Sequence, residues 1–312
     1  PDESGARAGV LVVLTLRSIT EEAPRTAAQD LEEQLAKAAA FTRKHAIASI
    51  YHAGSGYPGG TLSCADLLAC LFGAELNFWP NAVDDPARDR FVLSKGHAAP
   101  ALYAVGAHYG FCDAKAALNL RKLNSPFQGH PHVLDLPWVE TSTGSLGQGF
   151  SVALGMAMGL KLQNSTARVY ALLGDGELQE GEVWEAAMCA AHHCLDNLCV
   201  IIDYNKLQTD NRNSAIMRLE PLAAKWRAFD WAIAEIDGHD IHEILSTFRR
   251  AGITEARPSV IIAHTIKGKG VKYMEDVAAW HGSVKLTRDQ AEEALQSLGA
   301  KGAEIKELLD VR

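Results

Sequence analysis

Residues 174–208 read GDGELQEGEVWEAAMCAAHHCLDNLCVIIDYNKLQ, and they decide the fold of this chain. The apolar run 169–173 comes directly before them, and a second apolar run, 198–202, lies near their end. Each run has the length of a buried strand. Residues 182–193 contain no Gly or Pro and several Ala, which predicts a helix between the two runs. The stretch therefore predicts one strand–helix–strand unit of a parallel sheet.

A polar side chain follows each predicted strand. Asp175 comes just after the first strand, and Asn205 stands thirty positions later, just after the second. Because ligands of parallel sheets bind at the carboxyl ends of the strands, we expect these two side chains to converge. A carboxylate, an amide oxygen and a nearby backbone carbonyl suit a hard divalent cation. Gly174 and Gly176 would let the backbone approach a diphosphate closely, so the spacing predicts a metal ion that clamps a diphosphate.

The rest of the chain alternates between predicted helices and strands. Short strands are expected at 91–93 and 259–265, and helices at 26–52, 62–71, 98–106 and 150–162. This alternation predicts an α/β fold with a mainly parallel sheet flanked by helices. We divide the chain into an N-terminal tail (1–26), one large domain (27–284) and a C-terminal helical tail (285–312), in which 287–309 is amphipathic.

Composition narrows the functional class. The chain has 312 residues, 47% of them hydrophobic and 22% charged, and its formal net charge is −8 with no basic cluster. Nucleic acids and anionic membranes are therefore not expected as partners. No apolar stretch approaches the length of a membrane span. The six cysteines form no CxxC pair and several lie in apolar surroundings, which predicts reduced thiols in a cytoplasmic protein.

The spacing of GDG and Asn205 resembles the thiamine diphosphate signature, and GDGELQEGEVWEA is similar to the transketolase family. Further stretches resemble that family in its own order. They are SGYPGGTLSCADLLACLF (55–72), DRFVLSKGHAAPALYA (89–104), QGHP (128–131), TGSLGQGFSVALGMA (143–157), DGHD (237–240) and IKGKGV to WHG (266–282). The resemblance covers about residues 27–284. It stops where roughly the first half of a full-length transketolase would stop.

The resemblance implies a set of site residues. The metal ion, Mg²⁺ or Ca²⁺, would be held by Asp175, Asn205 and the backbone of Leu207. His97, His130 and His281 would contact the substrate or the cofactor, donate hydrogen bonds and move protons near neutral pH. The residues expected to bind the thiamine diphosphate are Gly144, Leu146, Gly147, Gly174, Asp175, Gly176, Glu180, Glu185 and Asn205.

Two of these positions, and Tyr57 in addition to them, carry a further expectation. Glu180 and Glu185 align with glutamates that lie at the subunit contact in the family, where paired carboxylates can share protons and couple two sites. Tyr57 stands where the family has a histidine, in SGYPG instead of SGHPG. A phenol donates a hydrogen bond but titrates near ~10, so it carries protons poorly at neutral pH. Tyr57 is therefore expected at the catalytic centre, with an altered role.

The resemblance implies a function and a partner. The chain would be the diphosphate- and metal-binding subunit of a two-component transketolase, which transfers a two-carbon ketol unit from a ketose to an aldehyde acceptor. About thirty residues follow position 284, too few for the family's second domain. A separate C-terminal subunit would then supply the activating glutamate and the phosphate-binding arginines, in a heterotetramer with two copies of each chain.

Three alternatives remain open at this point. The chain could belong to a specialised enzyme that moves a ketol or acyl unit to a non-sugar acceptor in secondary metabolism, which Tyr57 favours. It could be the α subunit of a 2-oxoacid dehydrogenase, although LQEGEVWEA and the SKGH and GHP motifs argue against this. It could also be a regulatory subunit with a vestigial site, although the intact Asp175 and Asn205 argue against that.

Overall fold

The computed structural model describes residues 25–310. Within them lies a five-stranded sheet of order β1-β2-β3-β5-β4, in which every neighbouring pair is parallel. The strands are β1 (Arg90–Leu93), β2 (Val169–Gly174), β3 (Leu198–Tyr204), β4 (Ala232–Asp237) and β5 (Ser259–His264). The predicted α/β class is confirmed. The predicted N-terminal tail lies almost wholly outside the described residues.

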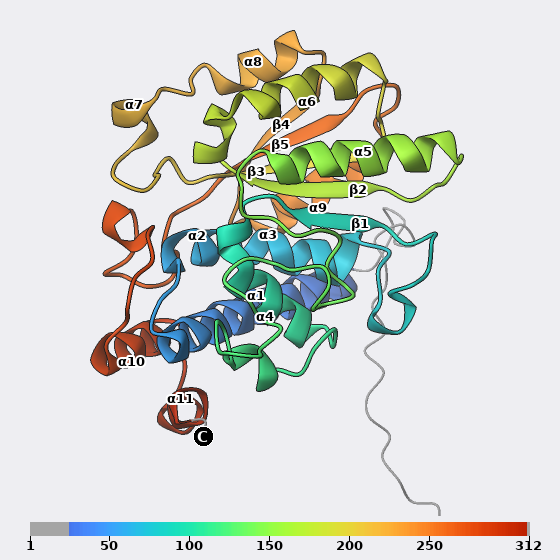
Figure 1. Ribbon diagram of the computed structural model, residues 1–312. Coiled ribbons are helices and arrows are strands. Elements are labelled where there is room, and N and C mark those ends of the chain that lie inside the picture. The colour runs from blue at the N-terminus through green and yellow to red at the C-terminus, as the bar shows by residue number, and fades with distance from the viewer. Residues whose placement is uncertain (1–24, 311–312) are drawn as a thin grey trace, which may run out of the picture.

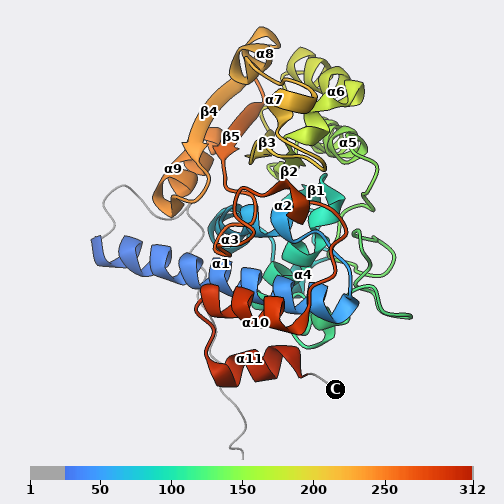
Figure 2. The ribbon, with the colours of Figure 1, turned by 90° about the vertical axis from the view of Figure 1, so that its left-hand side faces the viewer.

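Helices cover both faces of the sheet, which gives three layers (Figures 1 and 2). One face carries α5 (Gln148–Leu162), α6 (Gly181–His192) and α8 (Leu222–Ala228). The other side carries α1 (Arg25–Ala53), α3 (Ala65–Cys70), α4 (Ala99–His108) and α9 (Ile241–Gly252). The remaining α-helices of the described residues are α2 (Pro58–Ser63), α7 (Asn213–Ile216), α10 (Arg288–Ser297) and α11 (Gly302–Leu309).

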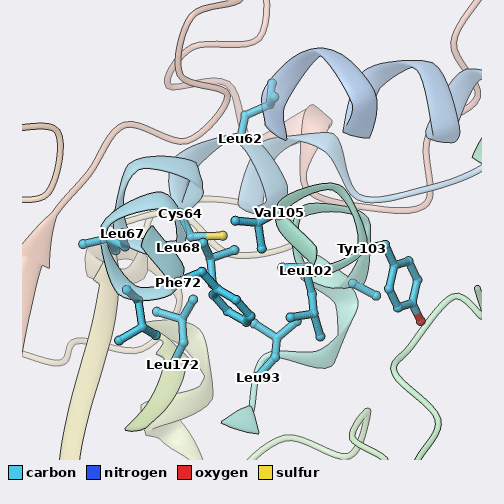
Figure 3. Close-up of a cluster of buried hydrophobic side chains, with 14 of the residues drawn as sticks. Leu62, Cys64, Leu67, Leu68, Phe72, Leu93, Leu102, Tyr103, Val105 and Leu172 are labelled. Atoms are coloured by element: carbon cyan, nitrogen blue, oxygen red, sulfur yellow. The ribbon is translucent and has the colours of Figure 1, made fainter. Parts of the chain in front are cut away.

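Successive side chains of a strand point to opposite faces of the sheet, and each face therefore has its own core. Tyr170 and Leu172 of β2 belong to the core shared with α1, α3 and α4, whereas Ala171 and Leu173 belong to the core beneath α5 and α6. In Figure 3 the side chains of Phe72 and Leu102 pack close to those of Leu93 and Leu172. Burial on both faces explains why the central strands are continuous apolar runs.

Several regions differ from the expectation. The helix expected at 62–71 is instead the pair α2 and α3, and α8 had not been expected. Residues 287–309 form two helices because Gly299 adopts φ 81° between them, and a short turn follows. Both helices contribute side chains to the same core as α1. Strand β4 and helix α9 had not been expected. β4 is an edge strand in which only Ile236 is buried, so its apolar pattern is interrupted.

The parallel order brings the carboxyl ends of β1, β2, β3 and β5 to one edge. Gly174 pairs with Asp203, and Tyr204 pairs with His264, so the segments that follow these strands start side by side. The predicted site residues that follow β1, β2 and β3 are thereby placed together. This edge is where ligands of parallel α/β sheets bind.

Candidate active site

A cavity of about 220 Å³ opens at the carboxyl ends of the strands. It is lined by segments that lie far apart in the sequence, and most of the predicted site residues are among them. These are Tyr57, His97, His130, Gly144, Leu146, Gly174, Asp175, Gly176, Asn205, Leu207 and His281. The structure therefore brings together the GDG turn, the Asn205 turn and the three histidine motifs.

Two of the predicted metal-binding oxygens face one position. The ammonium Nζ of Lys267 donates to the backbone oxygen of Leu207 at 2.5 Å and lies 3.3 Å from Asn205 Oδ1. Asp175, the third predicted ligand, lines the same cavity, and the Lys267 charge lowers its pKa. Oxygen atoms arranged in this way suit Mg²⁺ or Ca²⁺. The donor set therefore fits the metal that the sequence predicts.

The Asp175 carboxylate is held in place by backbone groups. Its Oδ1 accepts from Gly176 N at 2.8 Å, and its Oδ2 accepts from Lys206 N. Burial raises the pKa of Asp175 to about 6, and the Lys267 charge opposes that rise. Burial also lowers the pKa of Lys267 to about 8. A cation beside Asp175 and an anionic group beside Lys267 would each offset the cost of keeping these side chains buried and charged.

The histidines meet around Tyr57. The Tyr57 ring lies 5.4 Å from the His97 ring, 6.3 Å from that of His281 and 6.4 Å from that of His130, measured between centroids. The Arg121 guanidinium stands 5.5 Å from the Tyr57 ring centre. Tyr57 thus occupies the middle of the cluster in which the resemblance places a fourth histidine.

The electrostatics of this cluster favour neutral imidazoles. Burial, with Lys267 and Lys95 nearby, lowers the pKa of His281 to about 3. Burial and the Lys95 charge hold the pKa of His97 well below its usual value, and burial with Arg121 lowers the pKa of His130. His281 Nδ1 lies 2.7 Å from the Lys267 ammonium, so this nitrogen accepts the hydrogen bond. Near neutral pH these rings are neutral donors and acceptors.

Glu177 was not among the predicted site residues, although it lines the cavity. Its buried carboxylate accepts from Gly147 N at 2.9 Å, Gly174 N at 3.0 Å and the Ser94 hydroxyl. It therefore joins the GDG turn to the glycine-rich turn and to the segment that carries His97. Gly147 adopts φ 89°, which an L side chain rarely tolerates.

Two lysines were also missed. Lys95 and Lys267 are each 1% exposed and line the cavity. Both stand inside stretches that carry the family resemblance, SKGH and IKGKGV, and a lysine in a motif close to a predicted diphosphate was the signal that could have identified them.

Three predicted cofactor-binding residues do not line the cavity. Gly147 directs its N–H to Glu177. Glu180 and Glu185 are exposed at the start of α6 and on its outer face. Their expected place at a subunit contact stays a prediction.

The sequence model of the transketolase family's thiamine diphosphate-binding domain matches residues 34–308 of this chain. The chain belongs to the transketolase family. The resemblance of the motifs is thereby confirmed, and thiamine diphosphate is the cofactor of the matched domain. A divalent metal accompanies the cofactor in transketolases, in agreement with the oxygen ligands described above.

Two relatives from the same family are named as single subunits of split enzymes. One is a subunit of the apulose-4-phosphate transketolase of Phocaeicola vulgatus, 40% identical over 259 residues, which cover 83% of this chain and 92% of that protein. The other is the 6-deoxy-6-sulfo-D-fructose transketolase subunit SqwG of a Clostridium species. It is 40% identical over 274 residues, which cover 88% of this chain and 98% of that protein.

Solved transketolases share the fold over less than half of their own length. A transketolase from Campylobacter jejuni matches with a TM-score of 0.78 and 30% identity, over 90% of this chain and 47% of that one. A Pichia stipitis transketolase in complex with sedoheptulose 7-phosphate matches with a TM-score of 0.81 and 29% identity, over 88% of this chain and 43% of that one. Within residues 25–310 no helix is long and apolar enough to cross a membrane.

Proposed function

We propose that this chain is the diphosphate- and metal-binding subunit of a two-component, thiamine diphosphate-dependent transketolase. The activity would be transfer of a two-carbon ketol unit from a ketose to an aldehyde acceptor. The observation that carries the proposal is the cavity at the carboxyl ends of the strands, where the ligand oxygens of Asn205 and Leu207 face one cation position beside the histidine cluster. The cytoplasmic location remains a prediction from the cysteine content.

When bound, the cofactor supplies a carbon nucleophile that attacks the ketose carbonyl and permits cleavage of the adjacent carbon–carbon bond. This chain supplies the anchoring groups. Asp175, Asn205 and the Leu207 carbonyl would hold the metal ion. The ammonium groups of Lys95 and Lys267 would add positive charge beside a diphosphate.

The neighbouring cluster would handle the substrate. Neutral His97 and His130 can each donate one hydrogen bond to a sugar hydroxyl or carbonyl oxygen and accept another. His281, whose Nδ1 already accepts from Lys267, can donate through its other ring nitrogen. A neutral imidazole can also accept a proton from a hydroxyl as the carbon–carbon bond breaks. Tyr57, in the middle, retains a donor and is a weak proton acceptor.

We further propose a separate C-terminal subunit that supplies the activating glutamate and the phosphate-binding arginines. The word "subunit" in the names of the two relatives supports this. A heterotetramer with two copies of each chain would relate the two copies of this chain by a two-fold axis. Helices α5 and α6 lie side by side in Figure 1, and they expose Val152 in α5 and Met188, one turn after Glu185, in α6, which suits such a contact.

Tyr57 favours a second candidate function, a specialised enzyme that transfers the unit to a non-sugar acceptor. Its ring fills the space between three histidines, so the site offers one imidazole fewer than the family pattern implies. An acceptor screen with the partner present separates the two candidates.

The test is reconstitution. The chain is purified alone and together with the partner subunit that co-purifies with it from the native host. We expect ketol transfer from ketose phosphates only in the two-subunit preparation with thiamine diphosphate and Mg²⁺, and none with the isolated chain. Turnover by the isolated chain would contradict the need for a partner. Pyruvate decarboxylation without ketol transfer would support a 2-oxoacid dehydrogenase subunit instead.

A further inference from the structure

We infer that Asp203 is a positioning residue for the metal site, which fixes the side-chain amide of Asn205 so that its oxygen faces the cation position. This inference rests on the proposed function, because it concerns the same site. Asp203 stands near the end of β3, two residues before Asn205, and is fully buried. It does not line the cavity, so it would act only through its neighbours.

The Asp203 carboxylate gathers four donors. It accepts from the Ser63 hydroxyl at 2.6 Å and from Asn205 Nδ2 at 3.2 Å. It also accepts from the Lys95 ammonium and the Thr265 hydroxyl. These donors belong to α2, to the segments after β1 and β5, and to the Asn205 turn. One carboxylate thus joins four of the segments that build the cavity.

The orientation of the Asn205 amide follows from this contact. A carboxylate only accepts hydrogen bonds, so it binds the NH₂ end of an amide and rejects the oxygen end. With Nδ2 directed at Asp203, Asn205 Oδ1 is left to accept from Leu207 N at 3.2 Å and to face the Lys267 ammonium. A flipped amide would bring two oxygens together at Asp203 and turn its NH₂ group towards the cation position.

A buried carboxylate needs a charged partner to remain ionised, and Lys95 provides it. The two side chains are 1% and 0% exposed and form an ion pair. Lys95 Nζ also donates to the Gly60 carbonyl at 2.7 Å, in the helix that follows Tyr57. Removing the Asp203 charge would leave the Lys95 charge buried without its partner, so stability should fall as well.

A matched control separates positioning from general stability. Arg88 and Glu140 form another buried ion pair, with side chains 7% and 8% exposed, and neither residue lines the cavity. Glu140→Gln and Asp203→Asn each replace a buried carboxylate by the amide of nearly the same shape. Both variants should lower the melting temperature of the two-subunit protein measured without cofactor.

The decisive measurement is the Mg²⁺ concentration that gives half-maximal binding of thiamine diphosphate to the two-subunit protein. Loss of a group that orients a metal ligand typically weakens metal binding by ~10–100-fold, and we expect Asp203→Asn to raise the half-saturating Mg²⁺ concentration by that factor. Glu140→Gln should change the half-saturating Mg²⁺ concentration less than about twofold, since this substitution lowers only the stability of the protein. Equal shifts in the two variants would overturn the inference.

A milder variant covers the case in which Asp203→Asn does not fold. Thr265→Val removes one donor to Asp203 and keeps every charge. It should raise the half-saturating Mg²⁺ concentration by about two- to fivefold, because the carboxylate is held less firmly. If Asp203→Asn does not fold, an unchanged half-saturating Mg²⁺ concentration in Thr265→Val would overturn the inference. Failure of the wild-type protein to bind thiamine diphosphate with Mg²⁺ would instead overturn the proposed function, and the inference with it.

Discussion

The two ends of the sheet bury charged groups in different ways. At the amino ends, Arg88 pairs with Glu140, and Asp89 accepts from the backbone N–H groups of Asn77 and Arg168. At the carboxyl ends, Lys95 pairs with Asp203, while Asp175 and Lys267 border a cavity. The chemistry of the pairs is similar. The amino-end pair lies away from the cavity, whereas the carboxyl-end groups hold several segments around an opening.

The difference teaches how a binding site can be recognised among buried charges. A buried ion pair by itself is weak evidence for either stability or function. At the carboxyl ends, backbone and side-chain oxygens converge on a cation position next to neutral histidines. Substitutions there should therefore change ligand binding, whereas substitutions at the amino ends should change stability alone.

The strongest challenge to this comparison is Asp175→Ala. Removing one of the three expected metal ligands should abolish metal-dependent cofactor binding, with a loss of more than about 100-fold, while the fold persists without cofactor. The measurement is the thermal shift produced by thiamine diphosphate with Mg²⁺, since a ligand stabilises only a protein that binds it. If the variant keeps the wild-type shift, the metal assignment is wrong.

The next largest effect is expected for Tyr57→His. An imidazole at this position could accept a proton near neutral pH, a role worth roughly 10²–10⁴ in rate when the group is well placed. We expect higher kcat/KM on common sugar phosphates, or lower kcat/KM on the native substrate pair, measured with the partner subunit. Unchanged profiles on both would make Tyr57 a structural replacement and strengthen the ordinary transketolase assignment.

Glu177→Ala should affect both ligand binding and stability. It leaves two backbone N–H groups and the Ser94 hydroxyl without their acceptor, and each unsatisfied buried group costs about 1–3 kcal/mol. Chemical denaturation should show a loss of roughly 3 kcal/mol or more, and isothermal titration should show weaker cofactor binding. Glu177→Gln keeps one acceptor oxygen and should recover part of both. If Glu177→Ala lowers stability but keeps the wild-type cofactor affinity, Glu177 contributes to stability alone, like the charged groups at the amino ends of the strands.

The smallest effect concerns pH and a residue outside both ends. His45 in α1 stacks on Phe41, and burial lowers its pKa from 6.5 to about 4. The unfolded chain binds this proton below about pH 6.5 and the folded chain only below about pH 4, so stability falls as the pH drops through that window.

His45→Phe should remove this contribution. Because His45 is partly exposed, we expect its share of the loss between pH 7 and pH 5 to be about 1–2 kcal/mol. Denaturation at pH 7 and pH 5 measures it, and the loss between the two should be smaller in the variant. An equal loss in both proteins would assign the acid sensitivity to other groups, including the carboxyl-end histidines.

The sequence by itself determined the parallel α/β core and the heart of the site. Three local patterns can be read without knowledge of the fold. They are the apolar runs of strand length, the Gly-free helix between them and the thirty-residue spacing of Asp175 and Asn205. Strand β4 was not predicted, because an edge strand is half exposed and the alternation of its apolar and polar residues is weak. The two C-terminal helices were read as one, since their apolar spacing continues across the turn at Gly299.

Only the tertiary structure decided which polar residues work together. Lys95 and Asp203 are separated by 108 positions, Ser63 and Asp203 by 140, and Ser94 and Glu177 by 83. No periodicity or spacing rule relates residues so far apart, because their contact depends on the order of the strands. Tyr57 was placed among the histidines by the same long-range packing. A local pattern can specify an element and the residue that ends it, but the partners of a buried charge are set by the elements that surround it.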